Sequence, residues 1–188
     1  MNIKPIETIY NGFRFRSRAE ARWAVFFDVC KIQYMYEPEG FRLSDGTLYL
    51  PDFYLPESKT YFEVKGIMSD ADMHKIKQLQ KDLCVSIAIG YADMTFQSSD
   101  NYDWGGDQVF EIASKDESYI VKCPDCGKVF FMASTGYYGC QCCGYYDGDS
   151  IFSHSCCGDG KWFGHSEEFK GAFNIAKQAR FEHGEHGR

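Results

Sequence analysis

The sequence predicts an α/β protein in which a mixed sheet of four to five strands is flanked by helices and followed by a small cysteine-rich module. Between residues 17 and 90 the patterns follow the order helix, three strands, helix, strand. A helix that connects the third strand to the fourth makes those two strands parallel. Seven of the nine cysteines lie between Cys123 and Cys157 and mark the module. We therefore expect two domains, residues 1–117 and 118–188.

The first half of the chain supplies the elements of this core in order. Residues 7–16 predict a short hairpin or an extended entry, with Asn11-Gly12 as the turn. Ser17 then caps a helix that extends to about residue 30. Residues 32–37, 47–55 and 60–64 predict three strands, and the short turns between them indicate an antiparallel meander. A second helix over 69–83 leads into residues 85–90, an apolar run typical of a buried parallel strand.

The following segment is less regular. Residues 91–107 contain four aspartates and a Gly-Gly pair, and we expect them to form a loop. Residues 109–112 predict one further strand, and residues 167–180 predict a C-terminal helix. Cys30 and Cys84 stand apart from the other cysteines in apolar surroundings and are expected to be buried small side chains.

Composition limits the class of protein. Hydrophobic residues make up 44% of the 188-residue chain, which is enough to fill a core. The net charge of −7 argues against a protein that coats nucleic acid non-specifically. No stretch approaches the ~20 apolar residues of a membrane span, and the N-terminal residues lack the apolar core of a signal peptide. We expect a cytoplasmic protein without a membrane partner.

Two carboxylates and an amine have a spacing that can gather them at one sheet edge. Asp52 follows Pro51 in one predicted strand, and Glu63 and Lys65 lie in the next. Residues two apart on a strand share a face, so Glu63 and Lys65 project together while Val64 turns into the core. Such a group can hold a hard divalent cation beside a water. The simpler alternative is an ordinary surface ion pair between Glu63 and Lys65.

These residues resemble the motif of the PD-(D/E)XK, or restriction-endonuclease-like, nuclease superfamily. Pro51-Asp52 is followed, after ten intervening residues, by Glu63-Val64-Lys65. Many members carry a further glutamate on the first core helix, where this chain has Glu20. The order helix, three strands, helix, strand is also that of the superfamily, and the resemblance covers roughly residues 10–92. Small phage and transposon-end nucleases are the members that the chain resembles more closely.

The resemblance implies a role for each of these residues. Asp52 would be the central ligand of Mg²⁺ or Mn²⁺, with Glu63 and the carbonyl of Val64 as further ligands. Lys65 would orient or polarise the attacking water and stabilise charge on the phosphate. Glu20 would complete the cation shell directly or through water. Glu20 also occupies the third helical position after Ser17, where a glutamate normally bonds back to the helix cap.

Basic residues gather at the start of the first helix. Arg14, Arg16, Arg18 and Arg22 are accompanied by a single acid within residues 14–22. An acidic protein can still present one basic strip to phosphates, and a helix start also offers backbone N–H groups. A solvated face with local ion pairs is an equally good interpretation of the charges alone.

The cysteine module has the spacing of a zinc ribbon, which it resembles. Two C-x₂-C-Gly knuckles, Cys123/Cys126 and Cys140/Cys143, are separated by 13 residues. Four thiolates at such spacings close a tetrahedral zinc site, and each Gly permits the tight turn. A redox pair is the lesser alternative. The remaining potential ligands could form a second zinc site, or one of them could be the fourth ligand in place of Cys142 or Cys143: Cys142, His154, Cys156 and Cys157. Of these alternatives, we do not favour a second site.

Together these features predict a Mg²⁺- or Mn²⁺-dependent deoxyribonuclease with a structural Zn²⁺ ion. We expect an endonuclease of phage or mobile-element DNA metabolism, acting on DNA in the host cytoplasm. The alternatives are a ribonuclease and a non-catalytic adaptor that keeps the fold and binds nucleic acid or protein through the ribbon.

Overall fold

The computed structural model describes residues 5–104, 107–133, 140, 142–145, 155–157, 162–163 and 167–181. Its elements run in the following order: β1 (Thr8–Tyr10), β2 (Phe13–Phe15), α1 (Arg18–Val29), β3 (Met35–Tyr36), β4 (Phe41–Arg42), β5 (Leu48–Tyr49), β6 (Phe53–Leu55), β7 (Thr60–Lys65), α2 (Asp70–Leu83), β8 (Ser86–Tyr91), β9 (Phe96–Trp104), β10 (Asp107–Ile112), a 3₁₀ turn (Lys115–Glu117), β11 (Ser118–Lys122), β12 (Val129–Ala133), β13 (Ser155–Cys157), β14 (Trp162–Phe163) and α3 (Glu167–Gln178).

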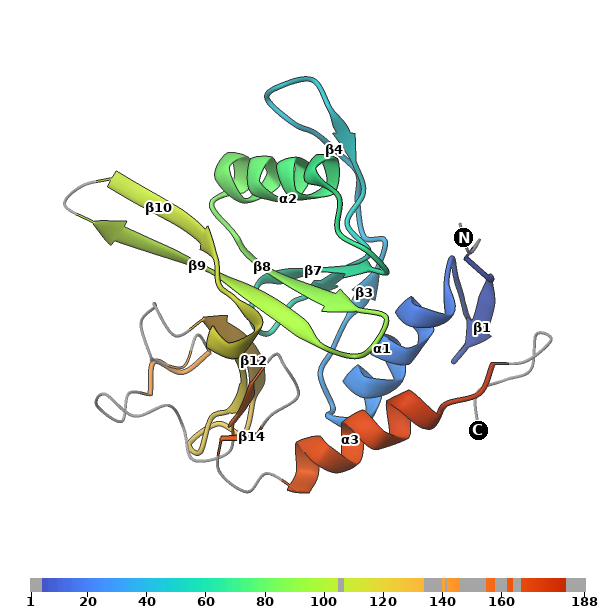
Figure 1. The fold of residues 1–188 in the computed structure, drawn as a ribbon. Helices are drawn as coiled ribbons and strands as arrows, with labels where there is room; N and C mark the ends of the chain where they lie inside the picture. Colours follow the sequence, from blue (N-terminus) through green and yellow to red (C-terminus); the bar gives the residue numbers. More distant parts are fainter. Residues whose placement is uncertain are drawn as a thin grey trace.

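The central sheet is mixed, as predicted. In the described part of the chain it has the strand order β10-β9-β8-β7-β6-β3. Strand β7 pairs with β6 antiparallel and with β8 parallel, and α2 is the crossover between the parallel pair. Figure 1 shows α2 on one side of this sheet and α1 with α3 on the other. The predicted order of helix, three strands, helix and strand is therefore present within a larger sheet.

Local signals placed the starts of the first elements correctly. The β1–β2 hairpin turns at Asn11 and Gly12, which both have positive φ. Such a turn suits the twist of the paired strands. Ser17 caps α1 and Ser69 caps α2, each accepting a hydrogen bond from the backbone N–H three residues on.

Two expectations for the strands were wrong. The loop expected over residues 91–107 is wrong for β9, which spans Phe96–Trp104 and pairs with both β8 and β10. Ser98 and Ser99 of this strand are buried. The Ser99 hydroxyl accepts from the Ile87 N–H and the Ser98 N–H donates to the Ser118 hydroxyl, whereas the Ser98 hydroxyl has no partner among the described residues. Residues 47–55 are divided into β5 and β6, with Pro51, which has no N–H for a ladder, between them.

The two faces of β7 and β8 bury different cores. On the α2 face, Tyr61 and Ile87 pack with Leu79 of the helix. On the α1 face, Phe62 packs against Trp23, whose ring centroid lies 4.8 Å away. Gly90 belongs to this second face, and a Cβ there would lie 2.5 Å from both aromatic rings. The alternation expected from a period of two is therefore confirmed on both strands.

The C-terminal half contributes to the same core. Helix α3 lies along α1, with Phe173 stacked on Phe26 at a centroid distance of 4.4 Å. Phe131 of β12 contacts Phe62 and Trp23. The boundary between residues 117 and 118 stays a prediction, and described side chains on its two sides share one hydrophobic cluster.

The two isolated cysteines differ in their surroundings. Cys30 is buried as expected, and burial raises the pKa of its thiol to about 12. Cys84 is exposed, which corrects the expectation of burial. It is the C-cap of α2 with a φ of 52°, so it ends the helix in a left-handed conformation and does not fill a core.

Candidate functional site

Asp52 and Glu63 are brought together by the pairing of β6 with β7. Phe53 pairs with Phe62 in this antiparallel ladder, which sets the preceding Asp52 beside the following Glu63. The Val64 N–H donates to Asp52 Oδ2 at 2.8 Å, and the Asp52 N–H donates to Glu63 Oε2 at 3.3 Å. Asp52 is only 6% exposed and Glu63 only 3%. The two predicted carboxylates therefore lie side by side, with Asp52 held by the Val64 N–H and Glu63 held by the Asp52 N–H.

The protonation of Asp52 is perturbed by this arrangement. Burial raises the pKa of Asp52 well above its ordinary value, and the charges of Glu63 and Glu20 raise it further. The hydrogen bond from the Val64 N–H and the charge of Lys65 oppose this rise without reversing it. A buried carboxyl that lacks enough positive charge is a group that a cation would stabilise in its ionised form.

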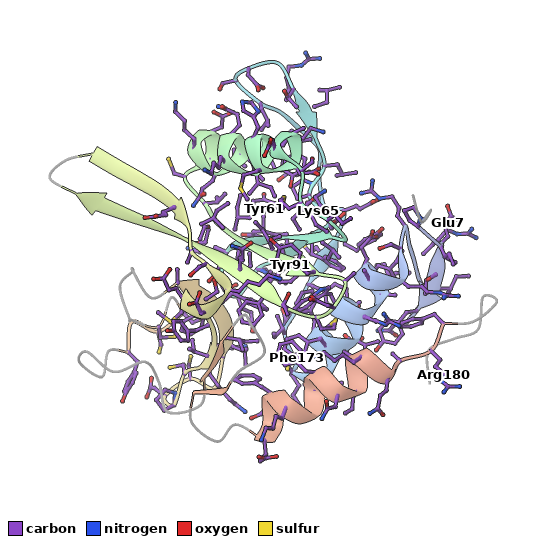
Figure 2. The ribbon with its side chains drawn as sticks, viewed as in Figure 1. Glu7, Tyr61, Lys65, Tyr91, Phe173 and Arg180 are labelled. Atoms are coloured by element: carbon purple, nitrogen blue, oxygen red, sulfur yellow. The ribbon has the colours of Figure 1, made fainter. Side chains whose placement is uncertain are left out.

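Lys65 completes the predicted motif. Its Nζ lies 2.6 Å from Glu63 Oε1 and 3.3 Å from Asp72 Oδ1. Burial lowers the pKa of Lys65, but the Glu63 charge and hydrogen bond outweigh it, so the pKa is raised. Figure 2 shows Lys65 near the N-terminal end of α2. Asp72 was missed by sequence reasoning because it is also part of the Ser69 capping box, which was its only visible signal.

Glu20 reaches the same site but is fully engaged. Its Oε1 accepts from the Ser17 hydroxyl at 2.7 Å. Its Oε2 accepts from the Tyr36 hydroxyl at 2.8 Å and from the Arg16 N–H at 3.0 Å. The structure thus places Glu20 beside the other carboxylates and also gives it the capping contacts that were the alternative interpretation. A ligand role would require at least one of these bonds to be exchanged.

A groove joins these residues at the edge of the sheet. It has a volume of about 400 Å³. Its lining includes all four predicted catalytic side chains and three residues that sequence reasoning missed: Glu20, Asp52, Glu63, Lys65, Tyr49, Asp72 and Lys75. Tyr49 hydrogen-bonds to Glu63, and burial together with the Glu63 charge raises the pKa of its hydroxyl. The groove therefore combines buried carboxylates with cationic side chains in one concave surface.

The four predicted phosphate-binding arginines have different positions. Arg16 lines the groove, where its Nη2 lies 3.4 Å from Asp52 Oδ1. Arg14 points to Glu7 at 3.2 Å and is exposed. Arg18 and Arg22 lie on α1, and the Nε atoms of both are buried without a hydrogen-bond partner among the described residues. Only Arg16 is therefore a groove residue in the described part of the chain.

The four knuckle cysteines form a second site. The Sγ atoms of Cys123 and Cys143 are 3.7 Å apart, and those of Cys126 and Cys140 are 3.6 Å apart. All four lie within 4.8 Å of one another. Zinc–thiolate bonds of about 2.3 Å in a tetrahedron require sulfur–sulfur distances of about 3.8 Å. The spacing of the cysteines therefore fits a metal such as zinc.

Each knuckle turns through a glycine, as predicted. Gly127 and Gly144 have φ values of 70° and 74°. Their N–H groups donate to the carbonyls of Cys123 and Cys140, both at 2.9 Å. Burial raises the pKa of the Cys123 thiol, but backbone N–H groups aimed at the sulfur outweigh it, so the pKa is lowered. The first knuckle thus favours the thiolate form of Cys123 that a metal requires, whereas burial raises the pKa of the Cys140 thiol in the second knuckle.

Of the additional cysteines, Cys142 lies outside this cluster. Cys142 donates its thiol to the Glu57 carbonyl, with Sγ 3.2 Å from the oxygen. Lys128, between the first knuckle and β12, also forms an ion pair with Glu57. Glu57 lies in the turn between β6 and β7, so the knuckles contact the connection of the two site strands. His154 and the side chains of Cys156 and Cys157 lie outside the described residues.

The two sites differ in how tightly their ligands are grouped. Among the described residues, the cysteines are the one group of three or more potential ligands that are close enough to share an ion. The carboxylates of Glu20, Asp52 and Glu63 form a looser set. Mg²⁺ usually takes only one or two carboxylates and keeps several waters, so Asp52 and Glu63 are a sufficient pair.

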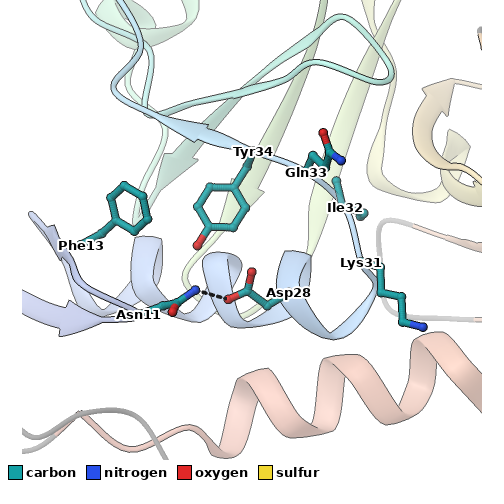
Figure 3. Close-up of a pocket in the computed structure, with 7 residues that line it drawn as sticks. All are labelled: Asn11, Phe13, Asp28, Lys31, Ile32, Gln33 and Tyr34. Atoms are coloured by element: carbon teal, nitrogen blue, oxygen red, sulfur yellow. Dashed lines mark hydrogen bonds between the residues drawn. The ribbon is translucent and has the colours of Figure 1, made fainter.

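A second concavity lies at the far end of α1. Its volume is about 490 Å³, and Figure 3 shows Asn11 donating to Asp28 across it, at 3.4 Å. Phe13 and Tyr34 supply aromatic walls. It contains a single carboxylate, Asp28, so it lacks the paired acids of the groove. Asp28 consequently serves as a matched control for the groove carboxylates.

Comparisons with known proteins add no family assignment. No model of a known protein family matches the chain, and neither does any curated protein. In the described residues, none of the helices has the length and apolar character needed to cross a membrane. Function is therefore inferred from the groove and the cysteine cluster.

Proposed function

We propose that this protein is a metal-dependent deoxyribonuclease that hydrolyses phosphodiester bonds within DNA, with a zinc-stabilised C-terminal module. The observation that carries the proposal is the pairing of Asp52 with Glu63 in a groove that also holds Lys65. The element order and the resemblance of these residues to the PD-(D/E)XK motif support an endonuclease of phage or mobile-element DNA metabolism.

The donor set of the groove suits Mg²⁺ or Mn²⁺. Asp52 and Glu63 would hold the cation, with the main-chain carbonyl of Val64 and Glu20 as additional ligands. Oxygen ligands are those that hard divalent cations prefer. Burial and the charges of Glu63 and Glu20 raise the pKa of Asp52, so a cation would stabilise its ionised form. When bound, such a cation supplies Lewis-acid activation of the phosphate and of a water.

The side chains of the groove have complementary tasks. Asp52 and Glu63 are fixed by backbone hydrogen bonds, so their oxygens are pre-organised. Lys65, held between Glu63 and Asp72, keeps a positive charge at the groove wall. There it can orient a water and stabilise negative charge that develops on the phosphate. Arg16 and Lys75 line the same groove and can contact flanking phosphates.

Cleavage assays test the proposal directly. Duplex, single-stranded and branched DNA are incubated with zinc-loaded protein and Mg²⁺ or Mn²⁺, with matched RNA duplexes to measure sugar preference. Asp52→Ala and Lys65→Ala should each lower the cleavage rate by about 100-fold or more, because each removes a charged group that would stabilise the transition state. Asp52→Asn, which keeps the shape of the side chain, guards against loss of the fold.

Asp28→Ala is the matched control, since it removes one carboxylate from the other concavity of the same core. It should cleave like the unaltered protein. Cleavage that survives Asp52→Asn and Lys65→Ala undiminished would reject the nuclease. A protein that binds DNA without cleaving any of these substrates, and without calorimetric Mn²⁺ binding that depends on Asp52, would instead be an adaptor.

A further inference from the structure

We propose that Arg16 competes with the divalent cation for the Asp52 carboxylate, and that it moves to a substrate phosphate when the cation is bound. The inference rests on the proposed function and assigns a role that the motif itself does not include. Arg16 would then be both a brake on cation binding and a substrate-positioning residue whose contact depends on the cation.

The position of Arg16 provides the first support. It lies in the link between β2 and α1, and its backbone N–H donates to Glu20 Oε2 at 3.0 Å and contacts the Tyr36 hydroxyl at 3.1 Å. The backbone is therefore held at the groove. The side chain is 55% exposed, in contrast to 9% for Asp52. A fixed backbone with a half-exposed, long side chain can pivot without disturbing the core.

The contacts of Asp52 provide the second support for the competition. Its Oδ2 accepts from the Val64 N–H at 2.8 Å, and its Oδ1 faces Arg16 Nη2 at 3.4 Å. Oδ1 is thus the oxygen available to a ligand from the groove. A Mg²⁺ ion binds oxygen at about 2.0–2.1 Å, so an ion on Oδ1 would lie next to the guanidinium. Two positive charges at such a separation repel each other.

A second acidic partner, Glu37, explains how the Arg16 side chain can leave Asp52. Arg16 Nε lies 2.5 Å from Glu37 Oε1, so the guanidinium is shared between two acids. Lys65 is bound to Glu63 and Asp72, so it does not take the place of Arg16 on Asp52. A phosphate drawn into the groove presents two oxygens, which a planar guanidinium can bind together. Arg16 can therefore exchange one anion for another.

Calorimetry with Mn²⁺ measures the competition. Zinc-loaded full-length protein is titrated with Mn²⁺ alone, comparing the unaltered protein with Arg16→Gln. The variant should bind Mn²⁺ about fivefold more tightly, the ratio that corresponds to a partly exposed ion pair worth about 1 kcal/mol. Arg14→Gln removes the same charge two positions earlier in the chain but breaks only a contact with Glu7, so its Mn²⁺ affinity should change less than about twofold.

Binding of a short DNA duplex measures the exchange. With Ca²⁺ as the cation, Arg16→Gln should bind DNA about fivefold more weakly, as expected for one lost phosphate contact. Without divalent cations the loss should be less than about twofold, because Arg16 is then held by Asp52. An equal loss under both conditions would overturn the exchange, and an unchanged or weaker Mn²⁺ affinity would overturn the competition.

The two proposals fail in different ways. If the unaltered protein gives no Mn²⁺ signal that Asp52→Asn abolishes, the nuclease and the competition are both rejected. If that signal is present but Arg16→Gln leaves it unchanged, only the competition is rejected and the nuclease stands.

Discussion

The groove and the cysteine cluster are two potential metal sites that are built on opposite principles. The four thiols lie within 4.8 Å of one another on two short knuckles, and backbone turns hold them in place. The groove carboxylates are spread over α1, the start of β6 and β7, and each is already paired with a backbone N–H or a cationic side chain. A closed set of ligands suits a structural ion, and an open set with exchangeable partners suits chemistry.

Removal of zinc should have the largest effect on the stability of the protein. A small effect would contradict the distinction between a structural cysteine site and an open groove. Chelation, or Cys140→Ser, should lower the melting temperature by about 10 °C or more, because a structural zinc site contributes folding free energy. Omitting Mg²⁺ should shift it by only a few degrees while abolishing cleavage. The measurement is calorimetric melting with and without each metal. A melting temperature that is insensitive to zinc would mean that the cysteines do not form a structural site.

Truncation of Phe173 tests whether the core that carries the groove and the C-terminal part that carries the cysteines fold as one unit. Phe173 stacks on Phe26 and belongs to the cluster that includes Trp23, Phe62 and Phe131. Phe173→Ala should cost about 3 kcal/mol by leaving a cavity between α3 and α1. Zinc release, followed with a chromophoric chelator, and the circular dichroism transition should shift together. Two separate transitions would instead support independent domains divided near residue 118.

Much of this comparison was accessible from the sequence, because the residues concerned follow local rules. The knuckle spacing and its glycines predicted the cysteine cluster. The period of two along β7 predicted that Glu63 and Lys65 share a face while Val64 is buried, and burial of Val64 is confirmed. Ser17 and Ser69 marked the helix starts correctly.

What the sequence did not reveal depends on contacts between distant segments. The pairing of Arg16 with Asp52 joins residues 36 apart, and nothing near either residue signals it. Asp72 resembles an ordinary helix cap, so its contact with Lys65 was not visible. Strand β9 was interpreted as a loop because residues 91–107 contain four aspartates and a Gly-Gly pair, although this strand pairs with β8 on one side and β10 on the other. The sequence also did not reveal that α3 packs against α1, which joins the two ends of the chain in one core.

Substitution of Asp52 should have a smaller effect on stability than removal of zinc or truncation of Phe173. It tests whether the groove is an open site that lacks positive charge. Its folded pKa is raised by burial, Glu63 and Glu20, so the folded protein binds the proton more tightly than the unfolded chain does. The stability that protonation contributes is present below about pH 4, the unfolded value, and is lost as the pH rises through the folded pKa. Without divalent cations, Asp52→Asn should therefore be more stable than the unaltered protein at neutral pH, by about 1 kcal/mol.

This gain should shrink as the pH falls toward about 4, where Asp52 becomes protonated in both states. Addition of Mg²⁺ at neutral pH should reduce it as well, since a cation on Asp52 offsets the cost of the ionised buried carboxyl. Urea unfolding at several pH values, with and without Mg²⁺, measures both dependences. An Asp52→Asn variant less stable than the unaltered protein at neutral pH would mean that Arg16 and the Val64 N–H already satisfy the carboxylate. The groove would then resemble the closed cysteine site in having no deficit of charge for an added cation to relieve.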